Sequence, residues 1–417
     1  MRIAYITQSY PPMISGAAIV ARNIAENMAA RGHSVLVMAA SDRGESYRSI
    51  NGNLMVLRMR SCHNPNRVGG RVALFPRGTF MQGLRNFHPD VIHTHDVLQL
   101  GVLSLLYKRT HDLPVLLTAH ALPNFALRYL PASLSHCEHV IEDCLWKYAR
   151  WVLRKFDAVT TPTQTTSATI FKMTEIQPYS ISNGVDLESF KPTRLRPQEE
   201  TGIRNRLGLP QKVPLILHVG RLDIDKGVDR VIMAAATSMS RTNAHLLLVG
   251  DGCQKPALQA LCRTLRIEER CHFPGYIMKE QGLPEVYRLA HLFVTASEIE
   301  TQGIVLLEAA ASGLPIVALR ATSIPEIVHD GVNGCLAEPG DTSAMSEAIT
   351  ALLLHPGKAR SMGEAGRQLA MSHDIGNMLD RYELLYTDLA RQHTAQRNQE
   401  KSRTPRMWKH VRDWIKL

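Results

Sequence analysis

Short runs of apolar residues alternate along the chain with longer stretches in which apolar positions recur every three or four residues. The runs predict short buried strands and the longer stretches predict amphipathic helices. Their alternation predicts a mostly parallel sheet with helices on both faces. In the first half, the predicted strands are residues 3–7, 34–39, 91–94, 115–119, 158–161 and 181–182. The predicted helices there include residues 17–31 and 138–155.

The same alternation resumes after the polar, proline-containing residues 190–200. The predicted strands of the second half are residues 215–219, 246–249, 271–273, 292–295 and 316–318. The predicted helices are residues 228–240, 255–266, 303–311 and 343–354. The chain of 417 residues is long enough for two cores. We therefore predict an α/β protein with two Rossmann-like doubly wound domains that face a cleft.

The predicted domain boundaries follow from this pattern and from the composition of the chain end. The N-terminal domain is expected at residues 1–185 and the C-terminal domain at residues 186–375. Residues 376–395 are expected to form a helix that packs back on the N-terminal domain. Residues 396–417 are expected to form a basic amphipathic tail.

Two cationic residues, Arg221 and Lys226, follow the first predicted strand of the second half. Doubly wound sheets bind ligands at the carboxyl ends of their strands. Two fixed cations there would stabilise a diphosphate leaving group, although solvated surface cations are the simpler alternative. Asp223 and Asp225 could instead hold a divalent ion. Because Arg221 and Lys226 already supply positive charge, we expect no metal and no cofactor besides the substrate.

Two glutamates mark a second candidate segment, which follows the fourth predicted strand of this half. Glu300 precedes a predicted helix, and Glu308 lies within that helix among apolar residues. Backbone N–H groups of Gln302, Gly303 and Ile304 would face an anion or a sugar hydroxyl. Carboxylates accept hydrogen bonds from neighbouring hydroxyls, so the two glutamates could hold a sugar and a ribose. A solvated Glu308 is the alternative, and its apolar neighbours disfavour it.

The second segment resembles the E-x7-E signature of retaining GT-B glycosyltransferases of the nucleotide-sugar "group 1" type, glycosyltransferase family four. Residues 220–227 resemble the G-R-x4-K-G phosphate loop of these enzymes. The resemblance covers about residues 1–395, and further matching motifs lie at residues 11–16, 32–35, 90–93, 118–120, 183–186, 250–252 and 330–334. The chain departs from the pattern at Ala17 and at Thr322–Ser323, where many relatives have glycine.

The resemblance implies a role for each matching residue. Arg221 and Lys226 would hold the donor diphosphate, Glu300 would contact sugar hydroxyls, and Glu308 would accept from the ribose. The backbone of Gln302, Gly303 and Ile304 would touch the sugar and phosphate. Gly16 would let the N-terminal domain approach the phosphates, and His120 would face the sugar or assist the reacting centre. A purely structural His120 is the alternative, and His93 and His95 are expected to be structural.

The net charge of +10 is concentrated in two parts of the chain. Residues 1–185 hold 19 Lys and Arg against 11 Asp and Glu, or +8, and the last 22 residues hold 7 against 2, or +5. Such surfaces attract nucleic acid or an anionic membrane. No nucleic-acid recognition motif is present, so we expect a membrane surface and no nucleic acid.

The expected acceptor and membrane contacts are basic residues with apolar neighbours. Arg71, Arg77 and Arg128 lie in such stretches of the N-terminal domain. In the tail, Trp408 and Trp414 fall at helical spacing with cations on the other face, which is typical of a helix lying on an anionic membrane. A tail that docks on its own protein or stays disordered is the alternative.

The location predicted for the protein is cytoplasmic, peripheral on the inner face of the plasma membrane. The first residues read as a strand and not as a leader, and no apolar run is long enough to span a bilayer. The seven cysteines are scattered without a C-x-x-C pair, as in proteins of a reducing compartment.

The sequence of residues 300–303 is similar to that of bacterial diacylglycerol glucosyltransferases, which favours UDP-glucose as donor and a lipid such as diacylglycerol as acceptor. The expected reaction is a front-face displacement in which the diphosphate leaves as the acceptor hydroxyl arrives, so that configuration is retained. Three alternatives stay open. They are a transferase for a polyisoprenoid-linked or soluble glycan, a GT-B sugar-nucleotide epimerase, and a silent membrane- or sugar-binding protein.

Overall fold

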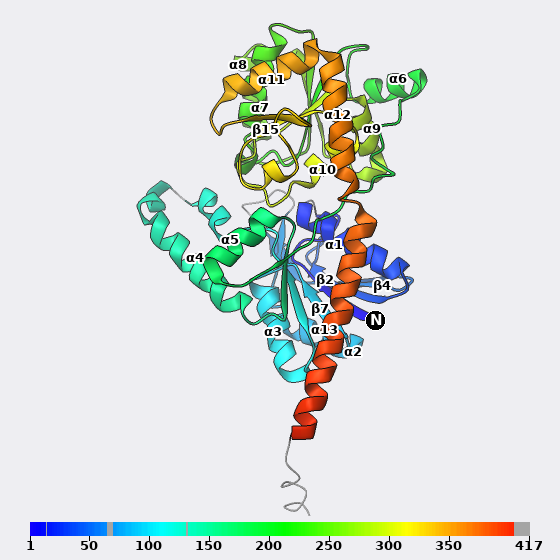
Figure 1. Cartoon of the computed structure of the whole chain (residues 1–417), viewed down its shortest axis with the longest axis vertical. Helices are drawn as coiled ribbons and strands as arrows, with labels where there is room; N and C mark the ends of the chain where they lie inside the picture. Colours follow the sequence, from blue (N-terminus) through cyan, green and yellow to red (C-terminus); the bar gives the residue numbers. More distant parts are fainter. Residues whose placement is uncertain (14, 65–69, 131, 404–417) are drawn as a thin grey trace, which may run out of the picture.

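Two parallel sheets covered by helices follow one another along the long axis of the molecule (Figure 1). The computed structural model describes residues 1–13, 15–64, 70–130 and 132–403. The N-terminal sheet has eight strands and the C-terminal sheet has six, and β5 and β6 form a small separate sheet. This architecture confirms the predicted α/β class with two doubly wound domains.

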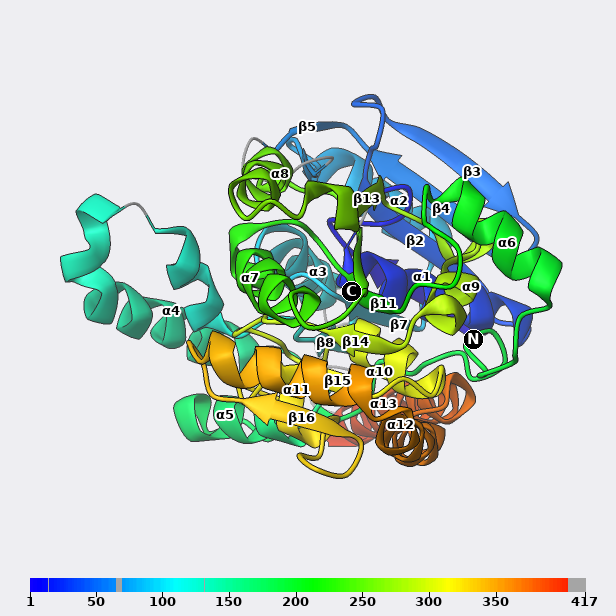
Figure 2. The ribbon, with the colours of Figure 1, turned by 90° about the horizontal axis from the view of Figure 1, so that it is seen from above.

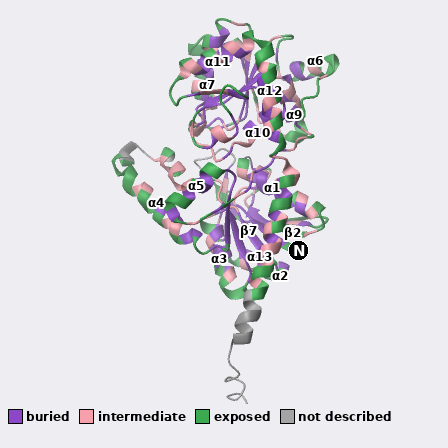
Figure 3. Cartoon of the chain, in the orientation of Figure 1, coloured by how far each residue is buried: buried purple, intermediate pink, exposed green. Residues whose placement is uncertain are grey.

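The N-terminal sheet has the strand order β10-β9-β8-β7-β1-β2-β4-β3. Its neighbours are parallel except for the antiparallel edge pair β3–β4. The strands are β1 (Arg2–Ile6), β2 (Ser34–Ala40), β3 (Tyr47–Asn51), β4 (Leu54–Met59), β7 (Val91–Thr94), β8 (Val115–Thr118), β9 (Ala158–Thr161) and β10 (Tyr179–Ser180). The central strands are buried on both faces, which explains their continuous apolar runs (Figure 3).

Five α-helices accompany this sheet in the described part of the domain: α1 (Gly16–Ala30), α2 (Arg77–Phe87), α3 (Gln99–His111), α4 (Glu138–Leu153) and α5 (Gln164–Thr174). Two 3₁₀ segments, η1 (Pro123–Tyr129) and η2 (Ala132–Cys137), precede α4, and β5 (Ser61–His63) pairs with β6 (Arg71–Ala73). The α4 region projects to one side of the molecule in both views (Figures 1 and 2).

The C-terminal sheet is wholly parallel and has the strand order β13-β12-β11-β14-β15-β16. Its strands are β11 (Leu215–Val219), β12 (His245–Val249), β13 (Cys271–Gly275), β14 (Leu292–Val294), β15 (Ile316–Leu319) and β16 (Gly334–Ala337). In chain order this sheet reads 3-2-1-4-5-6, the order of dinucleotide-binding Rossmann sheets. The order reverses between β11 and β14, so the loops after these two strands form the expected ligand edge.

The helices of the C-terminal domain are α6 (Pro197–Arg206), α7 (Val228–Met239), α8 (Lys255–Thr264), α9 (Leu283–Leu289), α10 (Ile304–Ala311), α11 (Thr342–Leu354) and α12 (Pro356–Met371). Short 3₁₀ segments are η3 (Ile224–Lys226), η4 (Glu268–Arg270), η5 (Lys279–Gln281) and η6 (Ile324–Glu326). Both η3 and α10 begin at the ligand edge, where their backbone N–H groups are available.

The last helix, α13 (Ile375–Arg403), leaves the C-terminal domain and packs along the N-terminal domain (Figure 1). Tyr382 and Tyr386 are fully buried there. The Tyr386 hydroxyl lies 3.0 Å from the Tyr5 hydroxyl on β1 and 2.7 Å from His93 Nδ1 on β7. The core of the N-terminal domain therefore includes side chains from the far end of the chain.

Two chain segments connect the domains, and they pair with each other. Val185 N–H donates to the His373 carbonyl at 2.9 Å, and Ile375 N–H donates to the Val185 carbonyl at 3.0 Å. A Cβ on Gly184 would lie 3.0 Å from Ile375 Cα, so a side chain at position 184 would press on this pairing. The chain thus crosses between the domains twice, and the two crossing segments are hydrogen-bonded to each other.

Several helices and strands were not predicted from the sequence, and one strand lies at residues other than those predicted. β10 lies at residues 179–180, two residues before the predicted strand. The edge strand β3 is mostly exposed and polar, so it has no apolar run to reveal it. β4, β5, β6, β16 and α12 were also not predicted, and most of these strands are short or lie outside the central buried layer.

Candidate active site at the facing sheet edges

The loop after β11 carries the two predicted cations, Arg221 and Lys226, on either side of the start of η3. Gly227 ends this loop with φ 59° and begins α7. A Cβ at position 227 would lie only 2.4 Å from the Ala296 carbonyl oxygen, so only glycine fits. The close approach brings the cationic loop against the segment that follows β14.

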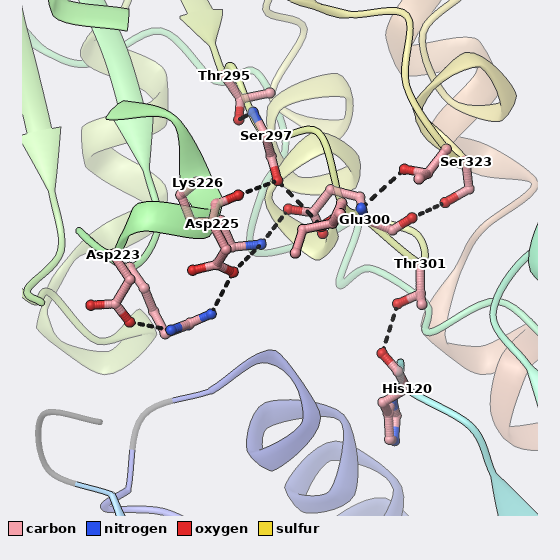
Figure 4. Close-up of polar contacts among 12 residues, drawn as sticks. His120, Asp223, Asp225, Lys226, Thr295, Ser297, Glu300, Thr301 and Ser323 are labelled. Atoms are coloured by element: carbon pink, nitrogen blue, oxygen red, sulfur yellow. Dashed lines mark hydrogen bonds and ion pairs between the residues drawn. The ribbon is translucent and has the colours of Figure 1, made fainter. Parts of the chain in front are cut away.

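The structure brings Lys226 and Glu300 together at this edge (Figure 4), and Asp225 lies between Lys226 and Arg221. Lys226 Nζ lies 2.6 Å from Glu300 Oε1. The Arg221 guanidinium lies 2.8 Å from Asp225 Oδ2 and also binds Asp223. Both cations therefore carry carboxylate partners, which a diphosphate would have to replace.

The two aspartates between the cations serve Arg221 in this structure. Asp223 Oδ1 also accepts from the Cys253 backbone N–H at 3.0 Å, which fixes it against the loop after β12. Within the described residues, no three His, Cys, Asp or Glu side chains gather as metal ligands would. The Asp223 and Asp225 pair thus acts as an anchor for the guanidinium.

The loop that carries Glu300 is held by Thr322 and Ser323, which follow β15. Glu300 N–H donates to Thr322 Oγ1 at 3.0 Å, and Ser323 Oγ donates to the Glu300 carbonyl at 2.6 Å. In the sequence these residues stand out only as departures from glycine, so this role was not predicted. Their position after a strand on the same sheet edge was the signal that could have revealed it.

Glu308 lies inside α10 and is buried. The Tyr287 hydroxyl donates to Glu308 Oε2 at 2.8 Å. Burial raises the pKa of Glu308 to about 7, and the hydrogen bond from Tyr287 offsets only part of that rise. Ligand hydroxyls that donate hydrogen bonds to this buried carboxylate would stabilise its ionised form. The role predicted for Glu308, binding ribose hydroxyls, requires such contacts.

Gln302 is fully buried, and its side chain serves the connection between the domains. Its Oε1 accepts from Asn183 N–H at 2.8 Å, and its Nε2 donates to Ser182 Oγ at 2.9 Å. The side chain is therefore occupied, and a donor contact by Gln302 would have to come from its backbone, as the sequence analysis predicted.

Gly16 and Ile304 face each other across the two domains. A Cβ on Gly16 would lie 3.7 Å from Ile304 Cδ1, so the first turns of α1 and α10 adjoin. Gly303, with φ 75°, turns the chain into α10 at this point. The starts of two helices thus meet where the predicted phosphate contacts were placed.

His120 follows β8 and lies opposite the Glu300 loop (Figure 4). Its carbonyl accepts from Thr301 Oγ1 at 3.0 Å. Its Nε2 lies 2.6 Å from His95 Nδ1, and the two rings stack at 4.9 Å. Burial lowers the pKa of His120 to about 4, so the ring is neutral at physiological pH.

His93 and His95, both expected to be structural, continue this stack into the domain core. The His93 and His95 rings stack at 4.4 Å, and His93 Nε2 lies 2.6 Å from Thr118 Oγ1. A hydrogen bond thus links Tyr386 on α13 to His93, and ring stacking continues from His93 through His95 to His120.

Arg128, predicted to contact acceptor or membrane, binds Glu298 of the other domain in this structure. Glu298 also binds Arg230 on α7. Burial alone would raise the pKa of Glu298, but hydrogen bonds from Arg128 and Arg230 bring it below its usual value. These three side chains, called the Glu298 clasp below, tie the domains beside the site.

The remaining predicted contacts lie away from this edge. Arg71 Nε donates to Ser61 Oγ at 2.8 Å within the small β5–β6 sheet. Arg77 begins α2. Trp408 and Trp414 lie outside the described residues, as does most of the predicted tail.

Two family models match the chain over the regions that meet at this edge. The model described as Glycosyl transferases group 1 matches residues 199–369, and the one described as Glycosyltransferase Family 4 matches residues 14–189. The first spans both the cationic loop and Glu300. This chain belongs to the group 1 glycosyltransferases.

Two relatives illustrate the similarity of this transferase to known sequences. It is 28% identical over 355 residues to an uncharacterized glycosyltransferase of Methanocaldococcus jannaschii, covering 85% of this chain and 89% of that protein. It is 24% identical over 357 residues to the alpha-monoglucosyldiacylglycerol synthase of Streptococcus pneumoniae, covering 84% of this chain and 79% of that one. The predicted resemblance to diacylglycerol glucosyltransferases is confirmed at this level.

Solved structures show that the transferase has the GT-B fold of two Rossmann-like domains. Sucrose-phosphate synthase of Thermosynechococcus elongatus matches with a TM-score of 0.76 at 23% identity, covering 93% of this chain and 98% of that one. Anabaena HepE in complex with UDP-glucose matches with a TM-score of 0.72 at 20% identity, covering 92% and 99%. Over its described residues, the transferase has no helix long and apolar enough to cross a membrane.

Proposed function

We propose that this transferase moves a hexosyl group, preferably from UDP-glucose, to a membrane lipid such as diacylglycerol with retention of configuration. One observation carries the donor half of the proposal: Lys226 joins the cationic loop to Glu300 through a 2.6 Å ion pair. Cations and a sugar-binding carboxylate are thus adjacent on a sheet edge suited to nucleotides.

Donor binding on this edge is an exchange of partners. The diphosphate takes Arg221 from Asp223 and Asp225, and it takes Lys226 from Glu300. Glu300, released from Lys226, then accepts hydrogen bonds from sugar hydroxyls. Because the cations keep carboxylate partners until the donor arrives, neither is left as an uncompensated charge in a partly buried site.

The chemical step follows from the same groups. As the bond to the diphosphate breaks, negative charge develops on the leaving oxygen beside Arg221 and Lys226. The acceptor hydroxyl approaches on the same face of the sugar, from the side of His120. Its oxygen forms the new bond to the anomeric carbon, and its proton passes to the leaving diphosphate oxygen. Since Arg221 and Lys226 place two positive charges beside the leaving group, we propose that these side chains neutralise the diphosphate without a divalent ion.

Two observations support a lipid acceptor. Relatives that match over most of the chain are named alpha-monoglucosyldiacylglycerol synthases, from Streptococcus pneumoniae and Acholeplasma laidlawii. The N-terminal half carries a net charge of +8, the sign that attracts an anionic membrane surface. We therefore propose that the protein works on the inner face of the plasma membrane.

The test is release of UDP or GDP from a panel of sugar nucleotides, with and without diacylglycerol in anionic liposomes. Liposome-dependent UDP release from UDP-glucose, lost in Glu300→Ala and kept in the exposed-residue control Glu338→Ala, supports the proposal. An α-linked product from the α-linked donor, identified by NMR, supports retention.

Other outcomes point to the alternatives. Transfer only to a polyisoprenoid-linked or soluble glycan would contradict the lipid acceptor while keeping the transferase. Interconversion of sugar nucleotides without any acceptor would indicate an epimerase. Donor binding without turnover under any condition would contradict the proposed reaction itself.

A further inference from the structure

An apolar groove lies on the N-terminal domain, between the start of α2, the start of α3 and α4. Its volume is about 580 Å³, and it is lined by Phe75, Pro76, Leu98, Val102, Leu103 and Tyr148, with Arg77 and Gln99 as polar members. Small-ligand sites in proteins occupy about 300–1,000 Å³, so the groove is large enough for a ligand.

Two groove residues have large apolar side chains that are exposed to solvent. Phe75 is 95% exposed and Leu98 is 62% exposed. The backbone of Phe75 has φ 43°, in the left-handed region that phenylalanine rarely adopts. An apolar ring is more stable out of water, yet the Phe75 ring is almost fully exposed. Such a side chain beside an apolar groove indicates a ligand that covers both.

One loop, residues 95–98, connects the groove to the reacting edge along the chain. Leu98 N–H donates to Asp96 Oδ1 at 2.6 Å, which fixes the start of α3. The same loop carries His95, whose Nδ1 lies 2.6 Å from His120 Nε2. The His120 carbonyl in turn accepts from Thr301, the residue after Glu300. A ligand in the groove therefore lies on the acceptor side of the site.

The chemistry of the lining identifies the occupant. A sugar requires several convergent donors and acceptors, whereas this groove offers only Arg77 and Gln99 among eight lining residues. Within the described residues Arg77 forms no ion pair, so its guanidinium can meet headgroup oxygens. We propose that the groove seats a hydrocarbon chain of the lipid acceptor and so holds its headgroup hydroxyl toward the reacting edge. This inference rests on the proposed lipid acceptor.

The groove makes acceptor recognition depend on chain length. A long chain that fills the groove removes both its own apolar surface and that of Phe75 and Leu98 from water. A chain too short to reach the groove gains no such burial. The donor binds on the other domain, so donor affinity should not depend on the groove.

The experiment compares Phe75→Asn and Leu98→Gln with a matched control, Ile50→Gln. Asparagine tolerates the positive φ of position 75. Ile50 is exposed to the same 62% as Leu98 but lies on edge strand β3. Transfer is measured to dioleoylglycerol and to dihexanoylglycerol, with acceptor-free UDP release as the readout of the donor site.

We expect KM for dioleoylglycerol to rise about tenfold in Phe75→Asn and Leu98→Gln, with kcat, dihexanoylglycerol transfer and acceptor-free UDP release unchanged. A photoreactive acyl chain should label residues 75–77 or 98–103. Equal KM values in all three variants, or labelling elsewhere, would overturn the groove assignment while leaving lipid transfer intact. If the wild-type protein glycosylates neither lipid, the proposed function fails and the groove assignment falls with it.

Discussion

Glu308 is a buried carboxyl that changes its ionisation near neutral pH. Its carboxyl is buried beside Tyr287, and burial raises its pKa to about 7. An ionised carboxylate accepts hydrogen bonds from two ribose hydroxyls more strongly than the protonated acid does. Donor binding should therefore be coupled to the loss of a proton.

The coupling predicts how UDP-glucose affinity changes with pH. If the ionised form binds, the apparent affinity should be about tenfold weaker at pH 6 than at pH 8, because a group of pKa about 7 is mostly protonated at pH 6. Calorimetry without acceptor measures this. Glu308→Gln should bind more weakly and show no such change; a pH dependence that persists in this variant would assign the proton to another group.

His95 is predicted to position His120 through its 2.6 Å hydrogen bond. Removing that bond in His95→Phe should lower kcat about 10- to 100-fold while the donor KM changes by less than about twofold, because the reacting geometry and not donor binding is disturbed. His95→Asn places an amide nitrogen near the position of Nδ1 and should recover part of the loss. A larger loss in His95→Asn than in His95→Phe would indicate that ring packing, which only phenylalanine retains, matters more than the hydrogen bond.

Among elements, α13 ties the chain end to the N-terminal core through buried hydroxyls. Tyr386→Phe would leave the Tyr5 hydroxyl and His93 Nδ1 without this partner. The free energy of unfolding should fall by about 1–3 kcal/mol, measured by urea denaturation. Tyr179→Phe, at an exposed position, is the control and should change little. A similar loss in both variants would contradict the role given to this contact.

The sequence predicted the elements that bury continuous apolar runs and the residues that carry distinctive charge. β7, β9 and β11 lie at their predicted residues. Arg221, Lys226 and Glu300 were selected from charge at strand ends and from motif spacing, and they meet in the structure. The polar edge strand β3 left no apolar signal.

Tertiary contacts explain what the sequence did not reveal. Thr322 and Ser323 hold the Glu300 loop only because β15 lies beside β14, a neighbour relation that spacing does not encode. The same holds for Arg128, whose partner Glu298 lies 170 positions away in the other domain. The groove is likewise assembled from three separate helices.

At the scale of the whole molecule, the Glu298 clasp and the Arg22–Glu280 ion pair, at 3.2 Å, join the domains. Glu326 adds to them by accepting from the backbone N–H of Gln164 at the start of α5, at 3.0 Å. Most of these contacts are partly exposed, so each contributes modestly. Together they bias the molecule toward the arrangement in which the sheet edges face.

Loss of one clasp residue should shift that bias measurably. Arg128→Ala should move the balance toward more separated domains by about 1.4- to 5-fold, the effect of an exposed ion pair worth about 0.2–1 kcal/mol. Fluorescence energy transfer between one label on each domain reports the shift. Added salt should produce the same shift in the wild-type protein and less in the variant.

Arg320→Ala is the control for this measurement, since Arg320 pairs with Asp330 and Glu338 inside the C-terminal domain. The distance distribution of this control should match that of the wild-type protein. A distribution unchanged in Arg128→Ala would show that the clasp does not govern the spacing of the domains.

The return of α13 to the first domain also has a consequence for biosynthesis. Ribosomes deliver about 5–20 residues per second, so about 10–40 s separate the emergence of β10 from that of Tyr382 and Tyr386. During that interval the half made first lacks part of its core, and by its end the half made second has all its strands, β11 to β16. A premature stop codon shortly before Tyr382 would thus damage the half of the protein that was translated earliest.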